Sequence, residues 1–258
     1  MMLTEPQTTP FDLDFRVAGI PVRVSGLFWA GALFIGWNSC RSFARGDGRE
    51  LLFYLAIWTL VVLGSILVHE LGQALAYRRF GQSARIVLYH FGGLAIPEGW
   101  RRRHLRPAER FVVSAAGPFS QLLLALLVIG GLRAAGYAVP FPFPWLGERL
   151  GLDEGRPYAS LRGLALAEFL VSVNVLWPLL NLVPVPPLDG GQMTREALET
   201  MGVADAGRIA SGIGLVTGGS LAWMAASRGE QFLAVMFAIL AVSCFQDLQQ
   251  SPPWRRWN

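Results

Sequence analysis

A histidine and a glutamate stand side by side near the end of a long apolar stretch of the sequence. The uncharged residues 51–68 lead directly into His69 and Glu70, and a glutamine follows at Gln73. Ionisable groups at the end of a lipid-spanning helix are costly and usually functional. In the helical pattern H-E-x-x-H, two histidines one turn apart bind zinc, and the glutamate acts on the metal-activated water. Here Gln73 stands where the second histidine is expected, so the pattern indicates hydrolytic metal chemistry with an altered ligand set.

A second acidic group follows another apolar segment, residues 161–188. A straight membrane-spanning helix rarely carries the prolines and asparagines of this segment, which are Asn174, Pro178, Asn181, Pro184, Pro186 and Pro187. We expect the helix to unwind at its C-terminal end, and unwound backbone is tolerated at membrane depth only where it lines a cavity. The sequence L-D-G-G-Q (188–192) comes at this point. Asp189 is therefore the natural carboxylate ligand to accompany His69.

Together these residues predict a hydrolytic zinc site. Such a site usually has three protein ligands and an open position for water. Zinc lowers the pKa of its bound water to about 7, and Glu70 can then take the proton and pass it to the leaving amine. Each segment also has a purely structural explanation. His69 and Glu70 can be a buried polar pair whose hydrogen bonds are satisfied inside a helix bundle, and Asp189 can belong to a turn that ends a helix.

The composition indicates a membrane protein. Of 258 residues, 53% are hydrophobic and only 16% are charged, and the apolar residues come in long blocks. We expect an all-α polytopic membrane protein with about six transmembrane helices and a short β-strand or hairpin element between the second and third spans. The expected spans are residues 25–40, 51–77, 111–132, 161–188, 209–227 and 231–245.

The basic residues predict how the chain is oriented. All 22 of them are arginines, the net charge is +4, and the densest cluster falls in residues 78–110. Because cytoplasmic loops carry an excess of basic residues, both termini and His69 are expected toward the cytoplasm, in the cell membrane. This bias explains the arginines, so nucleic acid is not expected as a partner. Within the basic cluster, R-I-V-L-Y-H (85–90) predicts a strand, and Gly92 and Gly93 predict a turn after it.

Four short motifs resemble the site-2 protease family of intramembrane zinc metalloproteases. They are H-E-L-G (69–72), F-G-G (91–93), A-G-P (116–118) and N-L-V-P-V-P-P-L-D-G-G (181–191). They match the family in kind, order and approximate separation, over about residues 24–195. The resemblance implies one zinc ion held by His69 and Asp189, with Glu70 as the general base. It also implies that Asn181 is a polar group near the substrate or the transition state.

The resemblance further implies a membrane-anchored protein as substrate and the lipid bilayer as surroundings. An extended segment of that substrate is expected to dock along the strand before Gly92 and Gly93. A helical peptide bond is shielded by its hydrogen bonds and must be straightened before attack, which strand addition achieves. The expected organisation is an interfacial N-terminal lead-in (1–24), a single transmembrane protease-like domain (25–250) and a C-terminal tail (251–258).

Two residues depart from the family pattern. Gln73 replaces the second histidine ligand, and Gln121 stands where an asparagine often follows the Gly-Pro. Gln73 lies on the same helical face as His69, but a neutral amide binds zinc less tightly than an imidazole, so Gln73 is a weak ligand or none. His90, at the end of the predicted strand, is a possible substitute ligand, and packing or substrate contact is the alternative role for it.

The sequence thus favours an intramembrane metalloendopeptidase that hydrolyses peptide bonds of membrane-anchored substrates by zinc-activated water. The alternative is a catalytically inactive relative that binds transmembrane segments without cutting them, because Gln73 replaces a histidine. A transporter or ion pathway would need further intramembrane charges, and apart from Glu168 the other predicted spans offer almost none.

Overall fold

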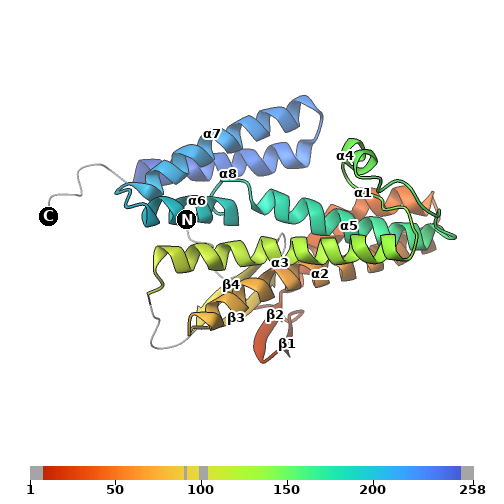
Figure 1. Cartoon of the computed structure of the whole chain (residues 1–258), viewed down its shortest axis with the longest axis horizontal. Helices are drawn as coiled ribbons and strands as arrows, with labels where there is room; N and C mark the ends of the chain where they lie inside the picture. The colour runs from red at the N-terminus through yellow and green to blue at the C-terminus, as the bar shows by residue number, and fades with distance from the viewer. Residues whose placement is uncertain (1–7, 90–91, 99–103, 251–258) are drawn as a thin grey trace. The chain divides into compact units, whose positions relative to one another are not determined.

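The computed structural model describes residues 8–89, 92–98 and 104–250, and within them it is mostly helical (Figure 1). The elements, in chain order, are β1 (Leu13–Val17), β2 (Ile20–Val24), α1 (Gly26–Ala44), α2 (Gly48–Arg79), β3 (Ser83–Tyr89), β4 (Gly92–Glu98), α3 (Pro107–Ala134), α4 (Pro144–Arg149), α5 (Leu161–Asn181), α6 (Asp189–Thr200), α7 (Ala206–Ser227) and α8 (Gln231–Gln250).

The chain forms two compact units, which are described separately. The N-terminal unit contains the described residues from 8 to 98 together with 116–178. The C-terminal unit contains residues 104–115 and 179–250. Helices α3 and α5 each contribute to both units, because the division falls after Ala115 in α3 and after Pro178 in α5.

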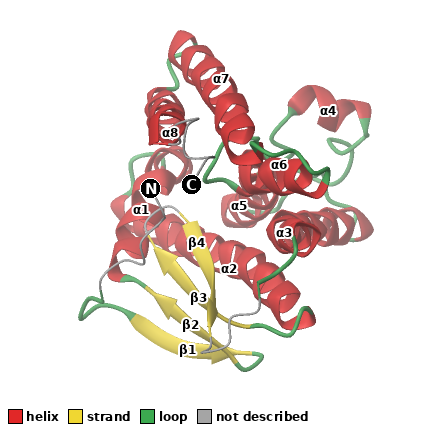
Figure 2. Ribbon diagram, turned by 90° about the vertical axis from the view of Figure 1, so that its left-hand side faces the viewer, coloured by secondary structure: helices red, strands yellow, loops and turns green. Residues whose placement is uncertain are grey.

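A four-stranded sheet in the order β1-β2-β3-β4 belongs to the N-terminal unit (Figure 2). Strands β1 and β2 pair antiparallel, β2 and β3 parallel, and β3 and β4 antiparallel. Both β3 and β4 contact α2. The predicted strand at 85–90 is confirmed over its described residues as β3. Gly92 and Gly93, predicted to form a turn, are instead the first two residues of β4, paired with Tyr89 and Leu88.

The segment before α1 is part of this sheet. The sequence predicts residues 11–24 to be an extended lead-in at the membrane surface, and the structure makes it the hairpin β1–β2. Alternate residues of β2, Ile20, Val22 and Val24, are buried in the hydrophobic core. Period-two burial of this kind holds the strand in register against β3, which places the sheet beside α2.

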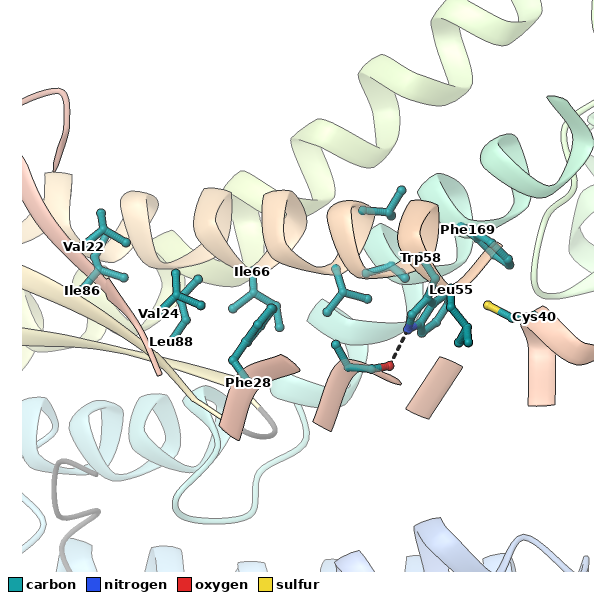
Figure 3. Close-up of a cluster of buried hydrophobic side chains, with 14 of the residues drawn as sticks. Val22, Val24, Phe28, Cys40, Leu55, Trp58, Ile66, Ile86, Leu88 and Phe169 are labelled. Carbon is teal, nitrogen blue, oxygen red and sulfur yellow. Dashed lines mark hydrogen bonds between the residues drawn. The ribbon is translucent and has the colours of Figure 1, made fainter. Parts of the chain in front are cut away.

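The core of the N-terminal unit joins α1, α2, α5 and the sheet (Figure 3). Trp58 of α2 donates a hydrogen bond from Nε1 to the carbonyl of Ala32 in α1, at 2.8 Å. Its ring meets Phe169 of α5 edge to face, with centroids 5.2 Å apart. Asp47 caps the start of α2 by accepting a hydrogen bond from the Arg49 backbone N–H at 2.7 Å. These contacts hold α2, the helix that carries His69 and Glu70.

Five helices in the described part of the chain are long and apolar enough to cross a membrane: α2, α3, α5, α7 and α8. The all-α membrane class with a small strand element is therefore confirmed. The sequence predicts about six spans, and α1, which covers the expected first span, is not among the five. Its last two turns carry Asn38, Ser39, Arg41 and Ser42, so the helix is more polar than the expected span suggests.

The expected span at 161–188 is helical only as far as Asn181, the end of α5, and its C-terminal end is unwound as predicted. Helix α6 then begins at Asp189, after an irregular segment that contains a cis bond between Pro186 and Pro187. A Cβ added at Gly191 would lie 2.5 Å from the carbonyl carbon of Val185, so α6 can start against this segment only because Gly191 has no side chain.

Helix α6 is also tied to the first turns of α3. Arg110 of α3 lies 3.6 Å from the carboxylate of Glu196 and pairs with Glu199. Ser114 donates a hydrogen bond to Glu196 at 3.1 Å. Glu196 is buried, and burial raises its pKa to about 7, with the Ser114 hydrogen bond and the charge of Arg110 opposing the rise.

Candidate functional site

His69 and Glu70 lie in the last third of α2 and are both buried, with 4% and 3% of their surfaces exposed. Gln73 follows one turn later on the same face. Its side-chain amide nitrogen lies 3.4 Å from His69 Nε2. The helical spacing seen in the sequence therefore brings these two side chains together, as predicted.

The other ring nitrogen of His69 contacts α3. His69 Nδ1 lies 3.1 Å from the side-chain oxygen of Gln121, and the Gln121 amide nitrogen lies 3.5 Å from the backbone carbonyl of Val173 in α5. Gln121 is fully buried. The three groups form a continuous path from the α5 backbone through α3 to the imidazole on α2, all within the N-terminal unit.

Two glycines allow α2 and α3 to approach each other at this point. A Cβ added at Gly117 would lie 2.5 Å from His69 Nε2 and 2.9 Å from the amide nitrogen of Gln73. A Cβ added at Gly72 would lie 2.5 Å from the carbonyl oxygen of Ala116. Small residues at such positions are the usual way for membrane helices to come close together. The absent side chain of Gly117 leaves a small space directly against His69 and Gln73.

The carboxylate of Glu70 lies against the sheet. A Cβ added at Gly93 in β4 would lie 2.6 Å from both Cδ and Oε1 of Glu70, so only a glycine lets the β4 backbone come so close. Tyr89, at the end of β3, is also near: burial, and then the charge of Glu70, raise the pKa of its phenol. The strand before Gly92 and Gly93, which is predicted to be the edge for substrate docking, is β3, and it pairs with both β2 and β4. That prediction is wrong: among the described residues the edge strand beside Glu70 is β4, which pairs only with β3.

These residues offer a metal ion two neighbouring positions. Two atoms bound to one tetrahedral zinc ion at about 2.0–2.1 Å lie about 3.3 Å apart, and the side chains of His69 and Gln73 approach to 3.4 Å. Turning the glutamine amide over exchanges its nitrogen and oxygen, so that the oxygen can face the ion. The space at Gly117 adjoins both groups. Among the described residues, no group of three or more His, Cys, Asp or Glu side chains lies close enough together to hold a metal ion.

Comparisons with known proteins show what the chain resembles. Residues 146–222 match the model of peptidase family M50. The chain is 30% identical over 165 residues to "Putative zinc metalloprotease sll0528" of Synechocystis sp., a match that covers 61% of this chain and 37% of that protein. It is 28% identical over 218 residues to "Putative zinc metalloprotease Rip3" of Mycobacterium tuberculosis, covering 75% of this chain and 47% of the relative.

A third relative and a solved structure complete the comparison. The chain is 27% identical over 207 residues to "Putative zinc metalloprotease Rip2" of Mycolicibacterium smegmatis, covering 69% of this chain and 72% of the relative. It has the fold of the site-2 protease from Methanocaldococcus jannaschii, with a TM-score of 0.56, 16% identity and coverage of 96% of this chain and 100% of that one. Together these matches show the resemblance to the site-2 protease family.

The resemblance inferred from the sequence motifs is therefore confirmed, and with its five apolar helices the protein is an integral membrane protein. The chain spans less than half the length of the sll0528 and Rip3 relatives. Those relatives are named as putative zinc metalloproteases.

The remaining predicted site residues lie on other elements than α2. Asn181 is the last residue of α5, Asp189 is the first residue of α6, and both belong to the C-terminal unit. Gly92 is the first residue of β4. His90, the possible substitute ligand, lies outside the described residues. The pairing of His69 with Asp189, and the role of Asn181, stay predictions.

The contact between Gln121 and His69 was not predicted from the sequence. Gln121 was noted only as a departure from the family pattern, although it stands one turn after Gly117 and therefore on the same face of α3. Asn174 of α5, the residue after Val173, is a second buried amide. Its nitrogen donates to the carbonyl of Leu170 at 2.8 Å, while its oxygen accepts no hydrogen bond from the described residues.

Proposed function

We propose that this protein is an intramembrane metalloendopeptidase that hydrolyses peptide bonds of membrane-anchored proteins with the help of one zinc ion. The observation that carries the proposal is the position of Glu70. Its carboxylate is buried, follows His69 on α2, and lies against the edge strand β4 at Gly93. A proton acceptor is thus held between a candidate metal ligand and a strand where an extended peptide can bind.

Each residue has a distinct role in this proposal. His69 would hold the ion through Nε2, Asp189 would supply a carboxylate oxygen, and Gln73 would add a weak amide ligand. When bound, zinc polarises the peptide carbonyl and lowers the pKa of a water molecule to about 7. Glu70 would accept a proton from the attacking water and pass it to the leaving amine. Asn181 donates a hydrogen bond to the substrate or the transition state.

Strand β4 supports the way in which the substrate is held. An added strand would bind through backbone hydrogen bonds and would straighten the segment to be cut. Because Gly93 has no side chain, that segment can come close to the Glu70 carboxylate. Substitution of Gly93 with alanine is therefore expected to interfere with Glu70 directly.

We propose that the protein works in the cell membrane, with both termini and the site toward the cytoplasm. The arginines of residues 78–110 support this orientation. The lipid bilayer and a membrane-anchored protein substrate are its partners.

A second function, binding of transmembrane segments without cleavage, is favoured by one observation. The amide nitrogen of Gln73 lies at His69 Nε2, where it can donate a hydrogen bond to the lone pair that a metal would use. Such a contact competes with zinc, and the complete histidine pair of the family pattern is missing. A weakly loaded site would still bind a substrate segment at β4.

The two functions are separated by cleavage of a fluorescent transmembrane substrate in proteoliposomes supplied with zinc. The wild type is compared with Glu70→Gln, Gln73→His and Gln231→His, the last as a control that adds a histidine at the exposed start of α8. Peptidase function predicts cleavage by the wild type and none by Glu70→Gln. The binding function predicts an inactive wild type that gains cleavage in Gln73→His and none in Gln231→His. Absence of both cleavage and substrate binding would overturn both proposals.

A further inference from the structure

We propose that Gln121 is a positioning residue that holds His69 with its proton on Nδ1, so that the Nε2 lone pair faces Gln73 and the space beside Gly117. The inference rests on the proposed function, since it assigns the residue that prepares His69 to bind the metal. It concerns the imidazole itself, however, and can be tested without metal or substrate.

The argument begins at the backbone carbonyl of Val173. A carbonyl oxygen only accepts hydrogen bonds, so the group of Gln121 that faces it, 3.5 Å away, must be the amide NH₂. This fixes the orientation of the amide, and its oxygen is then the atom that lies 3.1 Å from His69 Nδ1. An oxygen in that position accepts, so Nδ1 must carry the proton.

The position of the proton on Nδ1 also determines whether Nε2 donates or accepts a hydrogen bond. In a neutral imidazole one nitrogen donates and the other accepts. With the proton on Nδ1, Nε2 bears the lone pair, and this agrees with the amide nitrogen of Gln73 at 3.4 Å. The three side chains thus form one directional chain, in which Gln121 donates to Val173, His69 donates to Gln121, and Gln73 donates to His69.

Burial makes this arrangement depend on Gln121. The side chain is fully buried and His69 is 4% exposed, so bulk water is a poor substitute for the lost acceptor. Free neutral imidazole in water favours the tautomer protonated at Nε2, which cannot bind a metal through that atom. A partner at the far nitrogen that fixes ring orientation and tautomer is a general feature of metal-binding histidines. Here an amide on a neighbouring helix has that role.

The test is ¹⁵N NMR of the histidine side chains in metal-free, tag-free protein at a pH above the histidine pKa. The sequence has three histidines, so the double variant His90→Ala, His104→Ala leaves His69 as the only imidazole. In this background we expect the proton on Nδ1. Gln121→Leu, which has no acceptor, should move it to Nε2 or to a mixture. Gln121→Glu, which retains an acceptor oxygen, should keep it on Nδ1.

The matched control is Gln73→Leu, which removes the partner of Nε2 and should leave the proton on Nδ1. A His69 protonated at Nε2 without any change at Gln121 would overturn the inference, and so would a Gln121→Leu protein that keeps the Nδ1 proton. Zinc affinity gives a second readout, with a loss of about 10- to 100-fold expected in Gln121→Leu and recovery in Gln121→Glu. If the proposed function is wrong, zinc binding and cleavage will be absent. The position of the His69 proton is measured in metal-free protein, so it tests this inference independently of the proposed function.

Discussion

The space beside His69 can be closed by one methyl group, in the variant Gly117→Ala. The added Cβ would lie 2.5 Å from His69 Nε2 and 2.9 Å from the Gln73 amide nitrogen. Favourable contact between such atoms requires about 3.5 Å, so the imidazole or the helix must move by about 1 Å. Strain of this kind costs about 1–3 kcal/mol, against a gain of about 1 kcal/mol for replacing glycine by alanine in a helix.

We therefore expect Gly117→Ala to lose up to about 2 kcal/mol of stability and to bind zinc much less tightly. Zinc bonds to nitrogen are held within a few tenths of an ångström of about 2.0–2.1 Å, so a displacement of about 1 Å removes His69 from the ion. A loss of at least about 10- to 100-fold in zinc affinity follows.

The assay compares Gly117→Ala with Gly130→Ala in detergent, by thermal unfolding and by zinc titration. Gly130 lies in the same helix, and a Cβ there meets no atom within 4 Å. Gly130→Ala should therefore retain wild-type zinc affinity and lose no stability. A Gly117→Ala protein with wild-type zinc affinity would refute the placement of the metal beside His69 and Gln73.

Three further predictions concern individual carboxylates and amides. Glu70→Gln should keep its zinc and lose cleavage by at least about 10²-fold, because only the proton acceptor is removed; turnover near the wild-type rate would refute its role. Asp189→Asn should weaken zinc binding more than Gln73→Ala does. A metal titration that gives the opposite order would contradict this prediction. Burial raises the pKa of Glu196 from 4.5 to about 7, so the folded protein binds this proton more tightly than the unfolded chain. The resulting stabilisation is complete below about pH 4.5 and is lost as the pH rises through about 7. Glu196→Gln should flatten this part of the pH–stability curve, and an unchanged curve would contradict it.

Local sequence patterns predicted the parts of the site that lie on one element. His69 and Gln73 share a face of α2 because their spacing is one helical turn. The prolines at 184, 186 and 187 predicted that the segment unwinds at its C-terminal end, and α5 ends before them, at Asn181. The strand before Gly92 was visible in its β-branched and aromatic residues.

Contacts between elements were not predictable in the same way. The sequence of the hairpin β1–β2 predicts only an extended lead-in. Its residues do not show that β2 pairs in parallel with β3, a strand some 60 residues later in the chain. The contact of Gln121 with His69 depends on how α3 packs against α2, which the sequence signals only through the small residues Gly72 and Gly117. The polar residues Asn38 and Arg41 in the second half of α1 offset its apolar first half, so α1 is not among the five helices that are long and apolar enough to cross a membrane.

The central claim is that a zinc ion is bound at His69, and its most direct test is the zinc content of the purified protein in detergent. The account predicts about one zinc ion per chain in the wild type, nearly none in His69→Ala, and an undiminished content in Glu70→Gln. A His90→Ala sample shows whether that residue substitutes for the missing histidine. Equal zinc in the wild type and His69→Ala, or none in a correctly folded wild type supplied with excess zinc, would contradict it.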